Sequence, residues 1–249
     1  MSLLLSLVLI YLGVCLALFL GQRRLIYFPQ PEVKSESAEA VWIPSGTETL
    51  KLWRVNSGRT QAIVYFGGNA EEVSRNIPDY ADWFPDATIY FANYRGYGGS
   101  TGQPSEAALF ADAVRIFDQL APRYQDIAVV GRSLGSGVAV YLASQRPVQR
   151  LVLVTPFDSV ARIARRMFPV LPTSLLLQDR FDSVSRVPQV AAPVLVVVAA
   201  EDGVITRPHS DALVAAFPAN QLSIELIPEA DHNTIHLWPA YAQSLRDFL

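Results

Sequence analysis

The sequence predicts an α/β fold with a mostly parallel central sheet, helices on both faces and a small cap, preceded by an N-terminal transmembrane helix. Three observations predict this arrangement. Short apolar runs alternate with segments of helical spacing, residues 131–137 form a glycine-flanked turn directly after one such run, and residues 3–20 are apolar and uncharged. Strands buried on both faces are apolar throughout because neither face meets water, and helices between them indicate parallel pairing.

The expected elements follow in chain order. The strands are predicted at residues 40–43, 49–55, 61–66, 87–92, 127–130, 151–154, 194–199 and 223–227. One helix is expected to begin near Glu71 or Glu72, and another covers 106–120 with Ser105 as its N-cap. A third helix follows the turn at 131–137 and ends before Pro147, and a last helix covers about 239–248.

The turn at residues 131–137 places Ser133 at its apex, with Gly131 and Gly135 two positions away on either side. Glycines at these positions permit a cramped strand-to-helix turn that a Cβ atom would block. Such a turn holds a serine hydroxyl out at the end of a sheet, where it acts as a nucleophile. The other interpretation of Ser133 is an ordinary N-cap of the following helix.

A serine hydroxyl is a weak nucleophile and needs a base, which in turn needs an orienting acid. In this architecture the order along the chain is Ser, then Asp or Glu, then His. Asp202 follows the strand at 194–199, and His232 follows the strand at 223–227. Ligands of open α/β sheets bind at the carboxyl ends of the strands. The sequence therefore predicts Ser133, Asp202 and His232 as the catalytic residues.

Other residues remain as alternatives for the base and the acid. His236 lies four residues after His232 and is the alternative base, whereas Glu201 and Asp158 are the alternative acids. His209 is expected at the start of a helix, with a surface or capping role. Asp231, beside His232, is expected to be a solvated loop carboxylate.

Two backbone amides are predicted to stabilise the oxyanion that forms on an attacked carbonyl. One belongs to Leu134, the residue after the nucleophile. The other belongs to Asn69, which follows the strand at 61–66 after Gly67 and Gly68. Two consecutive glycines permit the unusual turn that aims a main-chain N–H inward, although a plain glycine turn is the alternative interpretation.

Several segments together carry a resemblance to a known family. They are residues 25–29, 66–70, 93–100, 131–137 and 179–183 and the loops that contain Asp202 and His232. In these segments the chain resembles the membrane-anchored branch of the α/β-hydrolase superfamily, the alpha/beta hydrolase domain-containing serine hydrolases. The resemblance covers nearly the whole chain. It implies the α/β-hydrolase fold, the same triad, and hydrolysis of an acyl bond.

Two departures from the family pattern affect loops rather than catalytic side chains. The family often has a histidine before the Gly-Asn of the oxyanion loop, where this chain has Gly67. It also commonly has a glycine three residues before the catalytic histidine, where this chain has Glu229. Both departures are expected to alter loop geometry and substrate range.

The N-terminal segment is predicted to be a membrane anchor at residues 1–24, followed by a hydrolase domain at 25–249. A helix over residues 3–20 spans about 27 Å, close to the ~30 Å hydrocarbon core of a bilayer. Arg23 and Arg24 follow the run, which places the catalytic domain on the cytoplasmic side. The alternative is a cleaved signal peptide and an exported enzyme.

Residues 157–188 interrupt the rhythm of strands and are predicted to form the small cap. The cap holds several arginines and an apolar run, which favour either an acyl pocket or contact with a membrane surface over a polar site. Ordinary packing of the cap on the domain is the alternative.

Composition excludes several other classes of function. The net charge of −3 gives no reason to expect a nucleic-acid partner. Three histidines and one cysteine supply no metal-ligand cluster, and the glycines at 96–102 lack nucleotide-binding spacing, so no cofactor is expected.

The expected activity is cleavage of ester or thioester bonds in apolar, lipid-like substrates through an acyl-enzyme, as in a carboxylesterase, lipase or acyl thioesterase. The alternative is a non-catalytic, membrane-tethered binding or scaffold protein. The sequence does not determine an oligomeric state.

Overall fold

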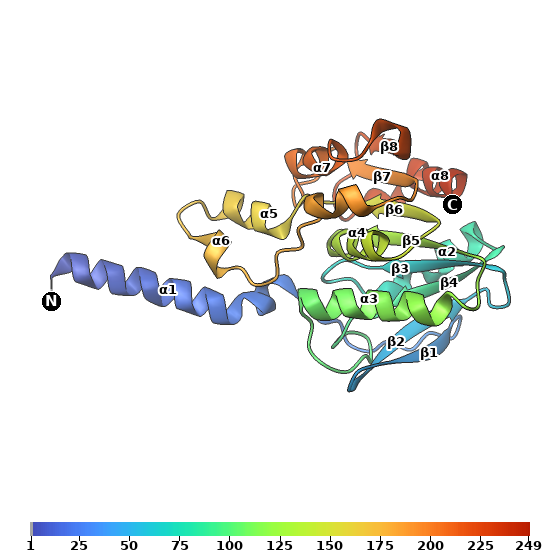
Figure 1. Cartoon of the computed structure of the whole chain (residues 1–249), viewed down its shortest axis with the longest axis horizontal. Helices are drawn as coiled ribbons and strands as arrows, with labels where there is room; N and C mark the ends of the chain where they lie inside the picture. Colours follow the sequence, from blue (N-terminus) through green and yellow to red (C-terminus); the bar gives the residue numbers. More distant parts are fainter. Residues whose placement is uncertain (1) are drawn as a thin grey trace.

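The computed structural model describes residues 2–249 and contains an eight-stranded sheet with helices on both faces (Figure 1). The strands are β1 (Glu39–Ser45), β2 (Glu48–Val55), β3 (Gln61–Phe66), β4 (Ala87–Ala92), β5 (Asp126–Arg132), β6 (Arg150–Val154), β7 (Val194–Ala199) and β8 (Leu222–Ile227). Their order across the sheet is β1-β2-β4-β3-β5-β6-β7-β8. All neighbours from β4 to β8 pair in parallel, whereas β2 pairs antiparallel with both β1 and β4. This arrangement confirms the predicted fold class.

The chain has eight α-helices within residues 2–249, and five of them cover the two faces of the sheet. The eight helices are α1 (Leu3–Ile26), α2 (Ile77–Trp83), α3 (Glu106–Leu120), α4 (Leu134–Gln145), α5 (Val160–Met167), α6 (Thr173–Leu176), α7 (Arg207–Val214) and α8 (Pro239–Phe248). Helices α3, α4 and α7 share one apolar core with the sheet, and α2 and α8 share the other. Alternate residues of β3 divide between the cores, with Val64 in the first and Tyr65 in the second.

Most predicted elements agree with the structure to within two residues at each end, but two helices, α2 and α7, begin elsewhere. Helix α2 begins at Ile77 rather than near Glu71 or Glu72. The intervening residues form a 3₁₀ turn, Val73–Asn76, in which the Glu72 side chain accepts a hydrogen bond from the Ser74 amide at 3.1 Å. The Glu71 side chain turns back toward the preceding loop, where it accepts a hydrogen bond from the Gly68 amide at 2.7 Å. Both carboxylates are therefore engaged outside a helix.

The N-terminal helix α1 projects from the rest of the molecule and lies beside α5 and α6 (Figure 1). It has 24 residues, and an 18-residue stretch of it has a mean hydropathy of 2.9 with only 6% of that stretch buried. This length and composition suit a membrane span or a signal sequence. Helices α5 and α6 belong to the predicted cap region between β6 and β7, near the carboxyl ends of the strands.

Candidate active site

Ser133 lies in a strained turn between β5 and α4. Its backbone angles are φ 51° and ψ −118°, in a region that residues with a Cβ rarely occupy. The Ser133 amide donates a hydrogen bond of 2.9 Å to the carbonyl of Val154 on the neighbouring strand β6. The turn is therefore held by the sheet, and it presents the serine at the sheet's carboxyl edge.

The flanking glycines are required by close packing rather than by their own backbone angles. A Cβ atom on Gly131 would lie 2.4 Å from the Gly135 carbonyl oxygen, and one on Gly135 would lie 2.0 Å from the Phe66 carbonyl oxygen. Both separations are far inside van der Waals contact, so neither position has room for a side chain. The two glycines thus let α4 start directly against β3 and β5, and Ser133 itself adopts the positive φ.

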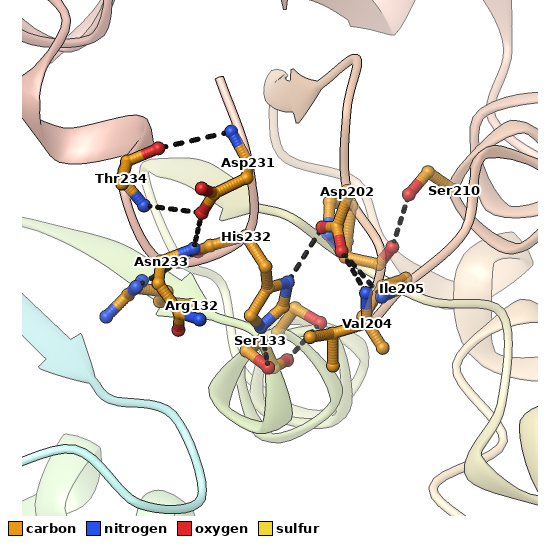
Figure 2. A network of polar contacts seen from close by, with 12 residues as sticks. Arg132, Ser133, Asp202, Val204, Ile205, Ser210, Asp231, His232, Asn233 and Thr234 are labelled. Carbon is orange, nitrogen blue, oxygen red and sulfur yellow. Dashed lines mark hydrogen bonds and ion pairs between the residues drawn. The ribbon is translucent and has the colours of Figure 1, made fainter. Parts of the chain in front are cut away.

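The structure brings Ser133, His232 and Asp202 into one chain of hydrogen bonds (Figure 2). His232 Nε2 lies 2.9 Å from Ser133 Oγ, and His232 Nδ1 lies 2.7 Å from Asp202 Oδ2. The other Asp202 oxygen accepts hydrogen bonds from the amides of Val204 and Ile205, at 2.8 and 2.7 Å. Because a carboxylate accepts hydrogen bonds, it keeps the proton on Nδ1 and leaves Nε2 free to accept the serine proton.

The alternative acids and the alternative base lie elsewhere. Glu201 is exposed, beside the buried Asp202. Asp158 is buried, and its Oδ1 lies 2.9 Å from Nδ1 of His209 rather than near His232. His236 borders the same cleft as Ser133, in the 3₁₀ turn Ile235–Leu237, and its ring makes no hydrogen bond to Ser133 within residues 2–249.

The predicted surface or capping role of His209 is wrong. The residue is only 7% exposed and pairs with Asp158. Helix α7 begins at Arg207 rather than at His209, so that His209 and Leu213 lie one turn apart on its buried face. The four-residue spacing of His209 and Leu213 could have indicated that both lie on the buried face of a helix. Nothing local in the sequence shows that Asp158 lies against this helix. Asp231 is exposed, as expected, and accepts hydrogen bonds from two amides of its own loop.

Asn69 and Leu134 both line the apolar cavity that reaches Ser133. Within residues 2–249, neither of their backbone amides donates a hydrogen bond to a protein acceptor. The neighbouring Gly68 amide is by contrast engaged by Glu71 Oε2 at 2.7 Å. Leu134 is also the first residue of α4, where the helix dipole favours negative charge. The structure therefore leaves both candidate oxyanion donors without a protein acceptor.

A partly buried ion pair, which the sequence did not indicate, links three parts of the site. Arg132 Nη1 lies 3.1 Å from Glu71 Oε2, and Arg132 Nη2 donates a hydrogen bond of 3.1 Å to the carbonyl of His232. Glu71 also accepts hydrogen bonds of 2.7 Å from the hydroxyl of Tyr65 and the side-chain amide of Asn76. The available signal was a charged residue, Arg132, inside the otherwise uncharged nucleophile turn.

The environment of Glu71 favours its charged form. Burial alone would raise the pKa of Glu71, but the Arg132 guanidinium and the Gly68 amide hold that pKa below its ordinary value of 4.5. The carboxylate therefore stays ionised at neutral pH and fixes the loop before it, including the residue adjacent to Asn69. Glu71 and Arg132 position the loops that carry the candidate oxyanion amide and the candidate base.

Ser133 opens onto two hollows of different character. A polar cleft of about 330 Å³ is bordered by Asn69, Glu71, Arg75 and His236 among others. A second, larger cavity of about 560 Å³, which also reaches Ser133, is lined mainly by apolar side chains from the end of α1, from α5 and from the Val204–Ile205 loop. Across residues 2–249, no three His, Cys, Asp or Glu side chains are grouped so that they would hold a metal ion.

Comparisons with known proteins agree with the fold. A family model described as "alpha/beta hydrolase fold" matches residues 62–176. An uncharacterized protein of Mycobacterium tuberculosis is 35% identical over 238 residues, which cover 89% of this chain and 84% of that protein. The alpha/beta hydrolase domain-containing protein aho-3 of Caenorhabditis elegans is 34% identical over 168 residues, which cover 66% of this chain and 49% of that protein.

Solved structures give the same result at lower sequence identity. An esterase of Pyrococcus furiosus has a TM-score of 0.73 at 15% identity and covers 89% of this chain, with 98% of the esterase matched. Est1E of Butyrivibrio proteoclasticus, solved with ferulic acid bound, has a TM-score of 0.71 at 16% identity, covering 84% of this chain and 97% of Est1E. The family model, the relatives and the sheet topology lead to one conclusion: the chain has the α/β-hydrolase fold.

Proposed function

We propose that this chain is a serine hydrolase that cleaves ester or thioester bonds of apolar acyl substrates. The observation that carries the proposal is the unbroken series of hydrogen bonds from Ser133 through His232 to Asp202. A histidine held between a serine and a carboxylate in this way is the arrangement that activates a serine hydroxyl. Hydrolase activity also agrees with the family and with its esterase neighbours.

The proposed reaction begins when Ser133 Oγ attacks the acyl carbon and His232 Nε2 takes the serine proton. Asp202 holds the ring in the required tautomer and stabilises the imidazolium that forms. The amides of Leu134 and Asn69 stabilise the oxyanion. His232 then gives its proton to the leaving alcohol or thiol as the bond to the acyl carbon breaks. Water, deprotonated by His232, attacks the acyl-enzyme and releases the carboxylic acid and the free serine.

The preference for apolar acyl groups rests on the cavity beside Ser133. Its walls include Phe157, Val160, Ile163 and Ile205, and it opens directly at the nucleophile. Burial of apolar surface contributes about 25 cal/mol per Å², so a cavity with these walls favours an alkyl chain over a polar group. The other cleft that reaches Ser133 is polar and suits the leaving group.

A retained membrane anchor is part of the proposal. The side chains of α1 are tied to the cap: Arg23 forms an ion pair with Asp179 at 3.0 Å, and Tyr27 donates a hydrogen bond to the same carboxylate. These contacts favour a helix that stays with the folded domain over a cleaved signal sequence. Arg23 and Arg24 at the end of α1 favour a cytoplasmic catalytic domain.

The direct test is hydrolysis of a p-nitrophenyl ester by the full-length protein and by its Ser133→Ala variant. The proposal predicts turnover by the wild type and none above background by the variant, with circular dichroism showing that both are folded. Full activity in Ser133→Ala would refute the assignment of the nucleophile. A folded wild type that neither hydrolyses esters nor reacts with a fluorophosphonate probe would favour the alternative, a non-catalytic binding or scaffold protein.

A further inference from the structure

The cavity at Ser133 does not end beneath the cap. A second hollow of about 320 Å³ continues from it between α1 and the α5–α6 segment. The two hollows share five lining residues, which are Leu25, Ile26, Val160, Ile163 and Met167. Shared walls place the two hollows directly next to each other, so that together they extend from Ser133 along α1 as far as Leu18; we call the two together the groove.

The distal section of this groove is almost entirely apolar. One wall is α1, with Leu18 and Leu25, and the facing wall includes Ala164, Leu171 and Leu176 from the cap. Leu18 and Leu25 are seven residues apart, so the α1 wall is about 10 Å long. No charged side chain lines this section within residues 2–249. A flexible alkyl chain is the occupant whose shape and polarity match such a groove.

The one strongly polar side chain in the distal section, Gln22, makes its hydrogen bonds to other parts of the protein. Gln22 is 7% exposed, and its amide nitrogen donates to the carbonyls of Phe19 and Leu176 at 2.8 and 2.9 Å. Its side-chain oxygen accepts a hydrogen bond of 2.7 Å from the Gln178 amide. Because these bonds satisfy Gln22, it does not specify a polar ligand. They also fix α1 against the cap, so the groove is formed before a substrate arrives.

The rim of the groove is apolar and open. Leu25 and Met167, which lie on opposite walls, are 62% and 65% exposed. The cap tip beyond them also exposes Val170 and Leu175, and the Val170 carbonyl accepts a hydrogen bond from the Tyr11 hydroxyl on α1. If α1 lies in a bilayer, as proposed above, this rim lies at the membrane surface, next to Arg23 and Arg24 at the end of the span.

From this continuity we infer that the distal groove binds the far end of a long acyl chain whose carbonyl lies at Ser133. The N-terminal helix is then part of the substrate site and not only an anchor. The chain enters sideways between Leu25 and Met167, directly from the membrane. The inference rests on the proposed hydrolase function, and it names the substrate class as long-chain acyl esters or thioesters of membrane lipids or lipid-modified molecules.

The test compares a long and a short ester, p-nitrophenyl palmitate and p-nitrophenyl butyrate, with the full-length protein in phosphatidylcholine nanodiscs. The variants Leu18→Trp and Ala164→Phe add bulk to the distal section only. Each is expected to lower the palmitate-to-butyrate ratio of kcat/KM about tenfold, the effect of excluding about two methylene groups from an apolar site. The matched control is Leu20→Trp, at a position of α1 that is 74% exposed and lies outside the groove.

The control is expected to keep the wild-type ratio. An unchanged ratio in Leu18→Trp and Ala164→Phe would overturn the inference, as would an equal fall in the control. The outcome for the proposed function is separate. A wild type that hydrolyses both esters, with no effect of any groove variant, would remove only the distal subsite. A wild type that hydrolyses neither ester would remove the proposed function, and the inference with it.

Discussion

Two buried histidine–aspartate pairs lie at the carboxyl edge of the sheet, and only one of them reaches a nucleophile. His232 and Asp202 are joined at 2.7 Å, and His209 and Asp158 at 2.9 Å. Both histidines are less than 10% exposed. The difference lies in the elements that hold them, since His232 is in the loop after β8, opposite Ser133, whereas His209 is on helix α7. A histidine–carboxylate contact therefore identifies a candidate base only when a nucleophile lies at the other ring nitrogen.

The two aspartates differ as well. Asp202 accepts hydrogen bonds from two amides of its own loop, Val204 and Ile205, so that its second oxygen serves the histidine alone. Asp158 accepts from the Ser159 amide at 2.7 Å and lies 3.4 Å from Arg162 on the cap helix α5. The first pair is thus organised around Ser133, and the second joins α7 to the cap. Making the same substitution at the matching residue of each pair shows whether only the first pair is needed for catalysis.

The largest expected effect comes from exchanging the two histidines for alanine. His232→Ala should lower kcat/KM for a p-nitrophenyl ester by about 10⁵-fold or more, because no group remains to take the serine proton. The matched variant His209→Ala should lower it by less than about tenfold, as expected of a side chain that does not touch the reacting atoms. Comparable losses in both variants would mean that the two pairs do not have separate roles.

The corresponding change of the aspartates should give the next largest difference. Asp202→Asn should lower kcat/KM by about 10⁴-fold, since an amide at this position favours the wrong tautomer of His232. Asp158→Asn should retain most of the activity. The comparison requires steady-state kinetics of both purified variants. If Asp158→Asn were the crippling change, the acid would have been assigned to the wrong residue.

A smaller effect is expected from the ion pair beneath the site. Glu71→Gln should lower kcat by about 10-fold to 100-fold with little change in KM, because the Gly68 loop and Arg132 lose their shared anchor and the loops at Ser133 shift. The neighbouring Glu72→Gln, whose side chain only caps a 3₁₀ turn, is the control and should stay near the wild-type rate. If kcat and KM changed to the same extent in Glu71→Gln and in Glu72→Gln, Glu71 would have no positioning role.

The lowered pKa of Glu71 predicts that the stability of the fold depends on pH. Because the folded protein lowers the pKa of Glu71 below 4.5, the carboxylate stabilises the fold above that pH, and the contribution is lost as pH falls through the lowered pKa. Urea unfolding should be measured from about pH 3 to about pH 7, a range in which a carboxyl group titrates. As the pH falls, the free energy of unfolding should decrease more steeply in the wild type than in Glu71→Gln. Parallel curves for the two proteins would contradict the charge assigned to Glu71.

The smallest expected effect is on the stability of the fold and not on the reaction rate, and it concerns the pair of His209 and Asp158. Asp158→Asn should lower the free energy of unfolding by about 1–3 kcal/mol, since the Ser159 amide and His209 lose a charged acceptor. Asp202→Asn should be compared with it in the same urea titration. A stability cost for Asp158→Asn without a rate cost would establish that this pair holds the cap to α7.

Much of the fold was predictable because its determinants are local. The buried strands β3, β4 and β7 are continuous apolar runs, and the Ser105 cap marks the start of α3, so their bounds follow from residue type alone. The positions of Ser133, Asp202 and His232 were predictable for a related reason. Each follows a strand, and a parallel sheet brings the carboxyl ends of its strands to one edge.

The contacts that were missed depend on tertiary structure. His209 and Asp158 are 51 residues apart, and Gln22 contacts Leu176 across 154 residues. The charge of Arg132 inside an uncharged turn showed that it needs a partner, but Glu71 is one of many carboxylates that would satisfy it. Which distant groups meet is decided by how the layers pack, and a single sequence records only that each group needs a partner.

The central claim is that Ser133 is activated by His232 and becomes acylated. The most direct measurement is peptide mass spectrometry of the full-length protein after reaction with a fluorophosphonate probe, with His232→Ala and His209→Ala treated in parallel. The account predicts an adduct on Ser133 in the wild type and in His209→Ala, and a strongly slowed reaction in His232→Ala. An adduct on another residue, or labelling of Ser133 at the wild-type rate without His232, would contradict it.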